Sequence, residues 1–228
     1  MTNNIAGRLR MLRYPMFVSA AIVAILFLFF PAIDTAVSHL AYSQGRFMQA
    51  DEHWWIGLLY YGIPKFAWLV LALLIGLLLM SYTGQPAWRK PAIFLLCAFL
   101  LGPGLFVHGI LKDHWGRARP FQTTEFGGQK VFSPAWVKTD QCEKNCSFVS
   151  GHAAMGFYPL AVAFLGWPYR RWLWGGVALG CFTGIVRIAQ GGHFLSDIVF
   201  AFYVVYFAAW LSYWLVYRRS PRLWGCES

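Results

Sequence analysis

Residues 187–197 read Arg-Ile-Ala-Gln-Gly-Gly-His-Phe-Leu-Ser-Asp and join two strongly apolar segments. His193 and Asp197 are four residues apart and would share one face of a helix. A carboxylate beside an imidazole fixes its tautomer and raises its basicity, which suits a nucleophile or a general base. Arg187 offers a planar fork of donors for a phosphate or a carboxylate. The alternative is a polar loop that only caps two membrane helices.

The composition predicts an all-α, polytopic membrane protein. The 228 residues are 58% hydrophobic and 12% charged, whereas soluble domains carry about 25% charged residues. Apolar segments close to the roughly 20 residues that span a bilayer predict six transmembrane helices at about 15–33, 60–81, 92–112, 152–167, 172–189 and 195–217. We expect one integral-membrane domain over 1–228 and a long loop at 113–149. The first span resembles a signal peptide, but no clear cleavage site follows it.

The net charge of +10 is a topology signal rather than a sign of nucleic-acid binding, because the cations concentrate in alternate segments. One set of segments holds a single acid, Glu227, and the cations Arg8, Arg10, Arg13, Arg89, Lys90, Arg170, Arg171, Arg218, Arg219 and Arg222. The other segments are close to neutral. Short loops rich in Lys and Arg stay cytoplasmic. We therefore expect both termini in the cytoplasm and the loop 113–149 on the outer side.

A second informative stretch is Lys-Asp-His-Trp-Gly-Arg-Ala-Arg-Pro at 112–120. Lys112 and Arg119 are seven residues apart, about two helical turns, so they can face one way. Pro120 disfavours a helical conformation at the residue before it. Two cations facing one way suit an anion with several oxygens. The alternative is an ordinary basic flank of a span, which is not expected on the outer side.

The third stretch is Ser-Phe-Val-Ser-Gly-His at 147–152, directly before the fourth span. Ser150 is a candidate N-cap, and the free backbone N–H groups of a helix start bind anions. Gly151 would let an oxyanion approach the backbone, and His152 could then donate a proton. The alternative is a cap followed by an interfacial histidine.

The pattern Lys-x6-Arg-Pro, then Ser-Gly-His, then Arg-x5-His-x3-Asp resembles the three signature motifs of the type 2 phosphatidic acid phosphatase family. Order and spacing match, and the resemblance covers about residues 85–200. Two positions differ from the family pattern. Val149 stands where the family usually has Pro, and Val186 stands where it often has Ser. The lost serine removes one hydrogen bond to phosphate.

The resemblance implies a role for each motif residue. His193 would attack phosphorus and form a phosphohistidine, with Asp197 orienting it. His152 would protonate the leaving oxygen and then activate water. The phosphoryl oxygens would be held by Lys112, Arg119, Ser150, Gly151 and Arg187. Such electrostatic clamps supply a large share of rate enhancement.

The resemblance implies no cofactor and no metal, and its substrate would be the phosphate of a membrane lipid. The loop sequences look most like those of lipid A phosphatases, ahead of enzymes for undecaprenyl pyrophosphate or phosphatidylglycerol phosphate. The site would face the periplasm from the inner membrane of a bacterium. A lipid phosphotransferase with the same residues is the alternative, and a non-catalytic lipid-binding or transport protein is the second one.

Five further residues have candidate roles. His114 and Arg117 lie between the two cations of the first motif and could contact substrate. Lys65 in the second span could contact an anionic headgroup or extend to the interface. Cys142 and Cys146 lie in the outer loop, where a disulfide is permitted. A metal pair is the rival for these cysteines, but no further Cys or His lies close in sequence.

Overall fold

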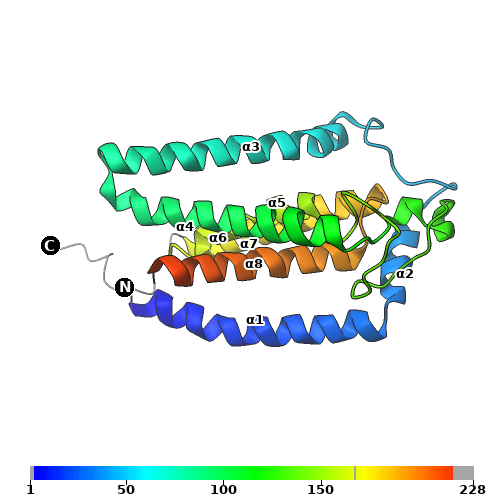
Figure 1. Ribbon diagram of the computed structural model, residues 1–228, viewed down its shortest axis with the longest axis horizontal. Coiled ribbons are helices and arrows are strands. Elements are labelled where there is room, and N and C mark those ends of the chain that lie inside the picture. Colours follow the sequence, from blue (N-terminus) through cyan, green and yellow to red (C-terminus); the bar gives the residue numbers. More distant parts are fainter. Residues whose placement is uncertain (1–2, 167, 218–228) are drawn as a thin grey trace.

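Long helices run side by side between two ends of the molecule (Figure 1). The computed structural model describes residues 3–166 and 168–217, and every long element in these ranges is helical. The long helices are α1 (Asn3–Phe29), α3 (Trp54–Thr83), α4 (Arg89–Phe99), α7 (Tyr169–Ala189) and α8 (Leu195–Tyr217). The prediction of an all-α fold is confirmed.

Four of these helical segments are long and apolar enough to cross a bilayer: α3, residues 86–112, α7 and α8. A fifth is counted if α1 and α2 (Ala32–Ala41) form one broken span, since they meet at a bend of 83°. The chain is therefore a multi-pass membrane protein. The segment 86–112 comprises η1 (Pro86–Trp88), α4 and a π-helical continuation, η2 (Leu100–Lys112). The wider winding of η2 accommodates Pro103, which has no backbone N–H.

The predicted fourth span, 152–167, differs from expectation. It forms two short helices, α5 (Gly151–Phe157) and α6 (Leu160–Ala163). Pro159 between them cannot donate a helical hydrogen bond, and tight turn bonds follow, such as Val162 N to Pro159 O at 3.1 Å. Residue 167 lies outside the described residues.

Helix α7 packs closely on its neighbours because glycines face them. A Cβ on Gly180 would lie 2.0 Å from the ring of Phe157 in α5. A Cβ on Gly184 would lie 2.4 Å from the side chain of Ile198 in α8. Small residues at such positions let membrane helices approach one another, and this holds the starts of α5 and α8 near the end of α7.

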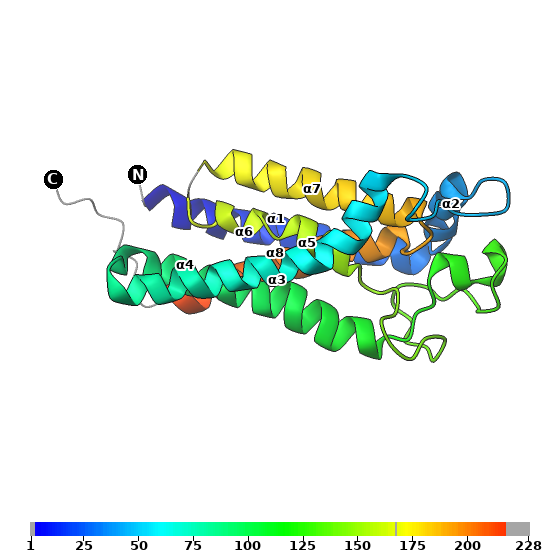
Figure 2. The same ribbon diagram turned by 90° about the horizontal axis from the view of Figure 1, so that it is seen from above.

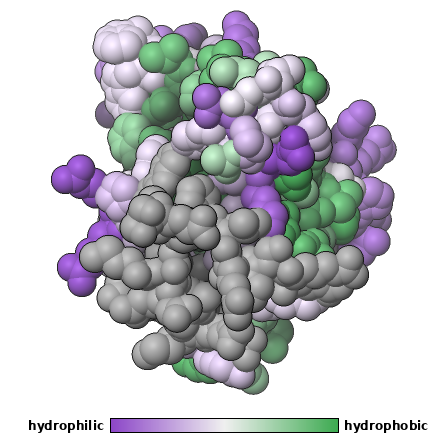
Figure 3. Space-filling view, turned by 90° about the vertical axis from the view of Figure 1, so that its left-hand side faces the viewer, coloured by the Kyte–Doolittle hydropathy of each residue, from purple (hydrophilic) through white to green (hydrophobic). Residues whose placement is uncertain are grey.

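Helix α2 and the loop 113–149 lie at the same end of the bundle (Figures 1 and 2), which we call the loop end. The loop contains the short turns η3 (Pro120–Gln122) and η4 (Thr124–Phe126). At the opposite end, hydrophilic and hydrophobic residues mix on the surface (Figure 3). Helices α4 and α7 begin there, at the predicted cytoplasmic cations Arg89, Lys90, Arg170 and Arg171. The side chains of Arg8, Arg10 and Arg13, and residues Arg218, Arg219, Arg222 and Glu227, lie outside the described residues.

Candidate active site

The three sequence motifs meet at the loop end. The backbone N–H of Ser150 donates to the carbonyl of Asp197 at 3.1 Å, which joins the second motif to the third. The carbonyl of Lys112 accepts from the backbone of Cys146 at 3.0 Å, which joins the first motif to the loop before the second. The ends of η2 and α7 and the starts of α5 and α8 thus surround one region.

His193 is fully buried at the centre of this region. Its Nδ1 lies 2.8 Å from the carbonyl oxygen of Ser147. A carbonyl only accepts hydrogen bonds, so Nδ1 carries the proton and Nε2 carries the lone pair. Nε2 is buried and has no hydrogen-bond partner within the described residues. A bare, oriented ring nitrogen of this kind suits a nucleophile.

Asp197 lies close to His193, but the two residues do not sit on one helical face as the spacing predicted. Helix α8 begins at Leu195, so His193 precedes the helix and the two residues do not share a helical face. Oδ2 of Asp197 accepts from Ser147 Oγ at 2.5 Å and from the Phe194 N–H at 2.9 Å, a carboxylate in the first turn reaching back to the N-cap. It is 3.5 Å from His193 Nδ1. The carbonyl of Ser147, not Asp197, is the nearer partner of the imidazole.

Arg117 does not face a substrate position. It is fully buried, and each of its three nitrogens donates to a protein acceptor: Nε to Ser133 O at 2.9 Å, Nη1 to Ser196 Oγ at 2.8 Å and Asp197 Oδ1 at 2.6 Å, and Nη2 to Asp34 Oδ2 at 2.7 Å. Asp34, from α2, also accepts from Ser196 N at 2.8 Å and Ser196 Oγ at 2.6 Å. We call Asp34, Arg117, Ser196 and Asp197 the buried network. It ties α2 and the loop to the start of α8, and it corrects the prediction that Arg117 contacts substrate.

Arg187 is held on several sides at the end of α7. Its guanidinium lies over the ring of Tyr60, 4.8 Å from the centroid, and Nη1 donates to Gln190 Oε1. A Cβ on Gly192 would lie 2.3 Å from Nη2, so only glycine permits this approach. Nε is buried, and no acceptor for it occurs in the described part of the chain.

His152 also rests on Tyr60. The two rings stack with centroids 5.8 Å apart, and His152 Nε2 lies 3.0 Å from the carbonyl of Tyr60. Nε2 therefore carries a proton, and Nδ1 is the nitrogen left for proton exchange. Tyr60, from α3, was missed by sequence reasoning, since a tyrosine in an apolar span carries no motif.

The positive charges of the motif residues Lys112, Arg119 and Arg187 act on His193. The pKa of His193 is lowered well below 6.5, first by burial and then by Lys112, Arg119 and Arg187. Lys112 is only 4% exposed, and Nη2 of Arg119 donates to the carbonyl of Asn145 at 2.7 Å. His193 is thus neutral at pH 7 and faces a concentration of positive charge suited to an anion.

Ser150 caps α5 as predicted, because its Oγ accepts from Ala153 N at 3.3 Å. Gly151 follows in a crowded position. A Cβ there would lie 2.8 Å from Nε2 of His108 and 3.5 Å from Nζ of Lys112. The glycine thus allows the first and second motifs to meet.

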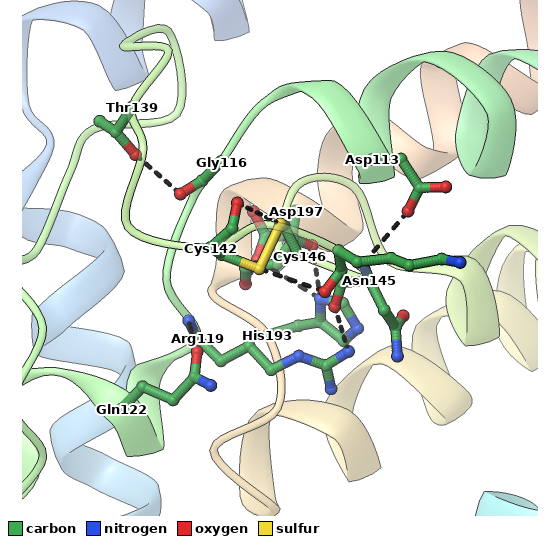
Figure 4. Close-up of a disulfide and its surroundings, with 12 residues drawn as sticks. Asp113, Gly116, Arg119, Gln122, Thr139, Cys142, Asn145, Cys146, His193 and Asp197 are labelled. Carbon is green, nitrogen blue, oxygen red and sulfur yellow. Dashed lines mark hydrogen bonds and ion pairs between the residues drawn. A yellow bond between two sulfur atoms is a disulfide. The ribbon is translucent and has the colours of Figure 1, made fainter.

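The loop over Arg119 is closed by a disulfide between Cys142 and Cys146. Figure 4 shows Arg119 beside His193, with this small loop next to them. The backbone N–H of Asn145 donates to Asp113 Oδ1 at 3.1 Å, and its carbonyl accepts from Arg119. The disulfide loop therefore positions one of the motif cations.

Two candidates lie apart from these contacts. His114 and Lys65 are exposed, and no hydrogen bond or ion pair joins either to the site in the described ranges, so their roles stay predictions. Among the residues with described positions, no group of three or more His, Cys, Asp or Glu side chains could hold a metal ion.

Comparisons with known proteins identify the family of this chain. The family model of the PAP2 superfamily matches residues 91–221, which include all three motifs. The chain belongs to this superfamily. It is 37% identical over 211 residues to a lipid A 4'-phosphatase of Francisella tularensis subsp. novicida, covering 86% of this chain and 91% of the relative.

Two rhizobial proteins match over a shorter region. The chain is 38% identical to a lipid A 4'-phosphatase of Rhizobium leguminosarum and 42% identical to one of Rhizobium etli, each over 121 residues. These matches cover 51% of this chain and about half the length of each relative, 52% and 47%. No solved structure matches the chain significantly. The family and the predicted class of enzyme, a lipid phosphatase, are confirmed.

Proposed function

We propose that this protein removes a phosphate from lipid A, as the names of its relatives state for them, and that the 4'-phosphate is the group removed. The observation that carries the proposal is the buried, unpartnered Nε2 of His193 among Lys112, Arg119 and Arg187. The 37% identity over most of both chains supports lipid A over other lipid phosphates.

The proposed reaction has two steps. Nε2 of His193 attacks phosphorus, the bond to the lipid oxygen breaks, and that oxygen takes a proton from Nδ1 of His152, which enters this step protonated on both ring nitrogens. Water then attacks the phosphohistidine and gives a proton to His152, the N–P bond breaks, and phosphate leaves. Lys112, Arg119, Arg187, Ser150 and the Gly151 amide hold the phosphoryl oxygens. Asp197 and the carbonyl of Ser147 stabilise the positive charge that develops on His193.

We further propose a single domain with six membrane crossings, with α5 and α6 together forming the fourth. Both termini would then lie in the cytoplasm, and the loop end would face the periplasm of a bacterial inner membrane. The cations at the starts of α4 and α7 support this orientation. A lipid would enter the site from the bilayer.

The test is phosphate release by the purified protein in detergent with EDTA present. The lipids are lipid A, undecaprenyl pyrophosphate, phosphatidylglycerol phosphate and phosphatidic acid, and the variants are His193→Ala and His53→Ala. We expect release from lipid A, lost by at least about 10⁴-fold in His193→Ala and kept in His53→Ala, whose side chain is exposed. Full activity in His193→Ala would contradict the phosphohistidine mechanism.

The alternative functions give different results in this assay. A phosphotransferase would release little phosphate until an acceptor lipid is added, because its site holds the same residues. A non-catalytic lipid-binding or transport protein would release no phosphate from any of the four lipids, with or without His193. Loss of all activity on addition of EDTA would contradict the metal-free mechanism.

A further inference from the structure

The segment 187–193 holds three buried polar atoms without a hydrogen-bond partner in the described ranges: Nε of Arg187, Nε2 of Gln190 and Nε2 of His193. Buried polar groups are nearly always satisfied, so each exception needs a physical account. The proposed function already accounts for the unpartnered atoms of Arg187 and His193, because Arg187 would bind the phosphoryl group and His193 would attack it. Gln190 belongs to no motif of the proposed site.

The orientation of the Gln190 amide follows from its neighbour. Nη1 of Arg187 donates to the Gln190 side chain, and a guanidinium offers donors only. The amide oxygen must therefore face Arg187, and the amide NH₂ must face away from it. This leaves two N–H donors of Gln190 buried and without an acceptor. A flipped amide would place N–H groups against N–H groups.

The backbone keeps Gln190 close to the reacting groups. The N–H of Gly192 donates to the carbonyl of Arg187 at 2.9 Å, and Gly191 has a positive φ of 61°. This glycine turn ends α7 and returns the chain toward Arg187. His193, one residue after the turn, has Arg187 among the charges that act on it. Gln190 and His193 thus lie on either side of one tight turn.

We propose that Gln190 is an additional ligand of the transferred phosphoryl group and donates through Nε2 beside Nε of Arg187. One phosphoryl group has enough acceptor oxygens for both orphaned donors. It would also bring phosphorus to the lone pair of His193. The identity of the lipid substrate rests on the proposed function. The binding of a phosphate-like anion by Gln190 does not.

The experiment measures binding of orthovanadate, a phosphate analogue, to the purified full chain in detergent at pH 8. Binding is followed by the rise of the thermal unfolding midpoint with vanadate concentration. Gln190→Met removes both polar atoms at nearly the same size, and we expect binding weaker by about tenfold or more. Gln129→Met is the matched control, since Gln129 is exposed in the outer loop, and it should bind as the wild type does.

A second variant separates contact from positioning. Gln190→Glu keeps an oxygen for Arg187 but replaces the NH₂ donors with a charged oxygen, so we expect vanadate binding weaker than in Gln190→Met. Wild-type binding in Gln190→Glu would overturn the proposal, because the oxygen facing Arg187 would then be sufficient. Wild-type binding in Gln190→Met would overturn it as well. A wild-type protein that binds vanadate but releases no phosphate from lipid A contradicts the proposed substrate alone.

Discussion

Two charged clusters meet near the start of α8, the buried network and the segment 187–193, and they differ in how fully their polar atoms are satisfied. In the buried network, Arg117 donates to two carboxylates, a hydroxyl and a carbonyl. In the segment 187–193, three buried atoms have no partner in the part of the chain that the structure describes. The first cluster is complete as it stands, whereas we propose that the phosphoryl group of the substrate completes the second. Under this proposal, hydrogen-bond satisfaction would distinguish the structural Arg117 from the ligand-binding Arg187.

The largest effect on stability should come from the buried network. Arg117→Met leaves Asp34 and Asp197 buried without their shared cation, and breaking a buried pair costs about 3–5 kcal/mol. We expect a much lower thermal unfolding midpoint in detergent together with loss of activity. Tryptophan fluorescence during heating measures the midpoint.

Arg46→Met is the matched control for this change. Arg46 also pairs with a carboxylate, Glu52, but its side chain is 59% exposed, and exposed pairs contribute little to stability. An equal loss of stability in both variants would contradict the distinction between the two clusters.

A smaller effect, on activity alone, should come from the ring beneath Arg187. Tyr60→Leu removes the platform of Arg187 and the stacking partner of His152. A cation over an aromatic ring is stabilised by about 0.5–2 kcal/mol, so we expect kcat/KM to fall by roughly tenfold. The thermal midpoint should barely change, because little of α3 is buried inside the protein.

Tyr60→Phe tests the cause of this effect. It keeps the ring and the backbone carbonyl, so activity should stay within about twofold of wild type. Phe66→Leu, at an exposed position of the same helix, should leave activity unchanged. If Tyr60→Phe and Tyr60→Leu lose the same activity, the hydroxyl rather than the ring is responsible.

The smallest effect concerns pH. Burial and then the cations Lys112, Arg119 and Arg187 lower the pKa of His193, so its neutral, nucleophilic form persists below pH 6.5. Arg119→Gln removes one of these charges and should raise that pKa. The acidic limb of the kcat/KM profile, which reports the free enzyme, should move to higher pH. A shift to lower pH, with the same lipid in both profiles, would contradict this electrostatic account.

Much of the site could be predicted because its chemistry lies in short, local patterns. Lys112, Arg119, Ser150, His152, Arg187, His193 and Asp197 are spaced as in the family motifs, and the chain belongs to that family. Three supporting residues could not be found in this way. Asp34 comes from α2, Tyr60 from α3 and Ser147 from the loop 113–149, and they act through contacts between segments far apart in the chain.

Local patterns also led to two incorrect geometric predictions. Arg117 lies between two motif cations and was a candidate for substrate contact, but its Nη2 donates to a carboxylate from α2, 83 residues away. Asp197 was expected to meet His193 on one helical face, but the helix begins between them. The number of residues between two side chains predicts their separation in space only where the secondary structure between them is known.

The sequence by itself determined the membrane class, the all-helical fold and the chemical groups available for phosphoryl transfer, because hydrophobicity, charge distribution and motif spacing are local properties. Tertiary structure decided which of these groups stay unsatisfied. Arg117 and Arg187 are the same residue type, in the first and third motifs, yet packing surrounds one with acceptors and leaves a buried donor of the other bare. That difference depends on which distant segments meet, and hence on the folded chain as a whole.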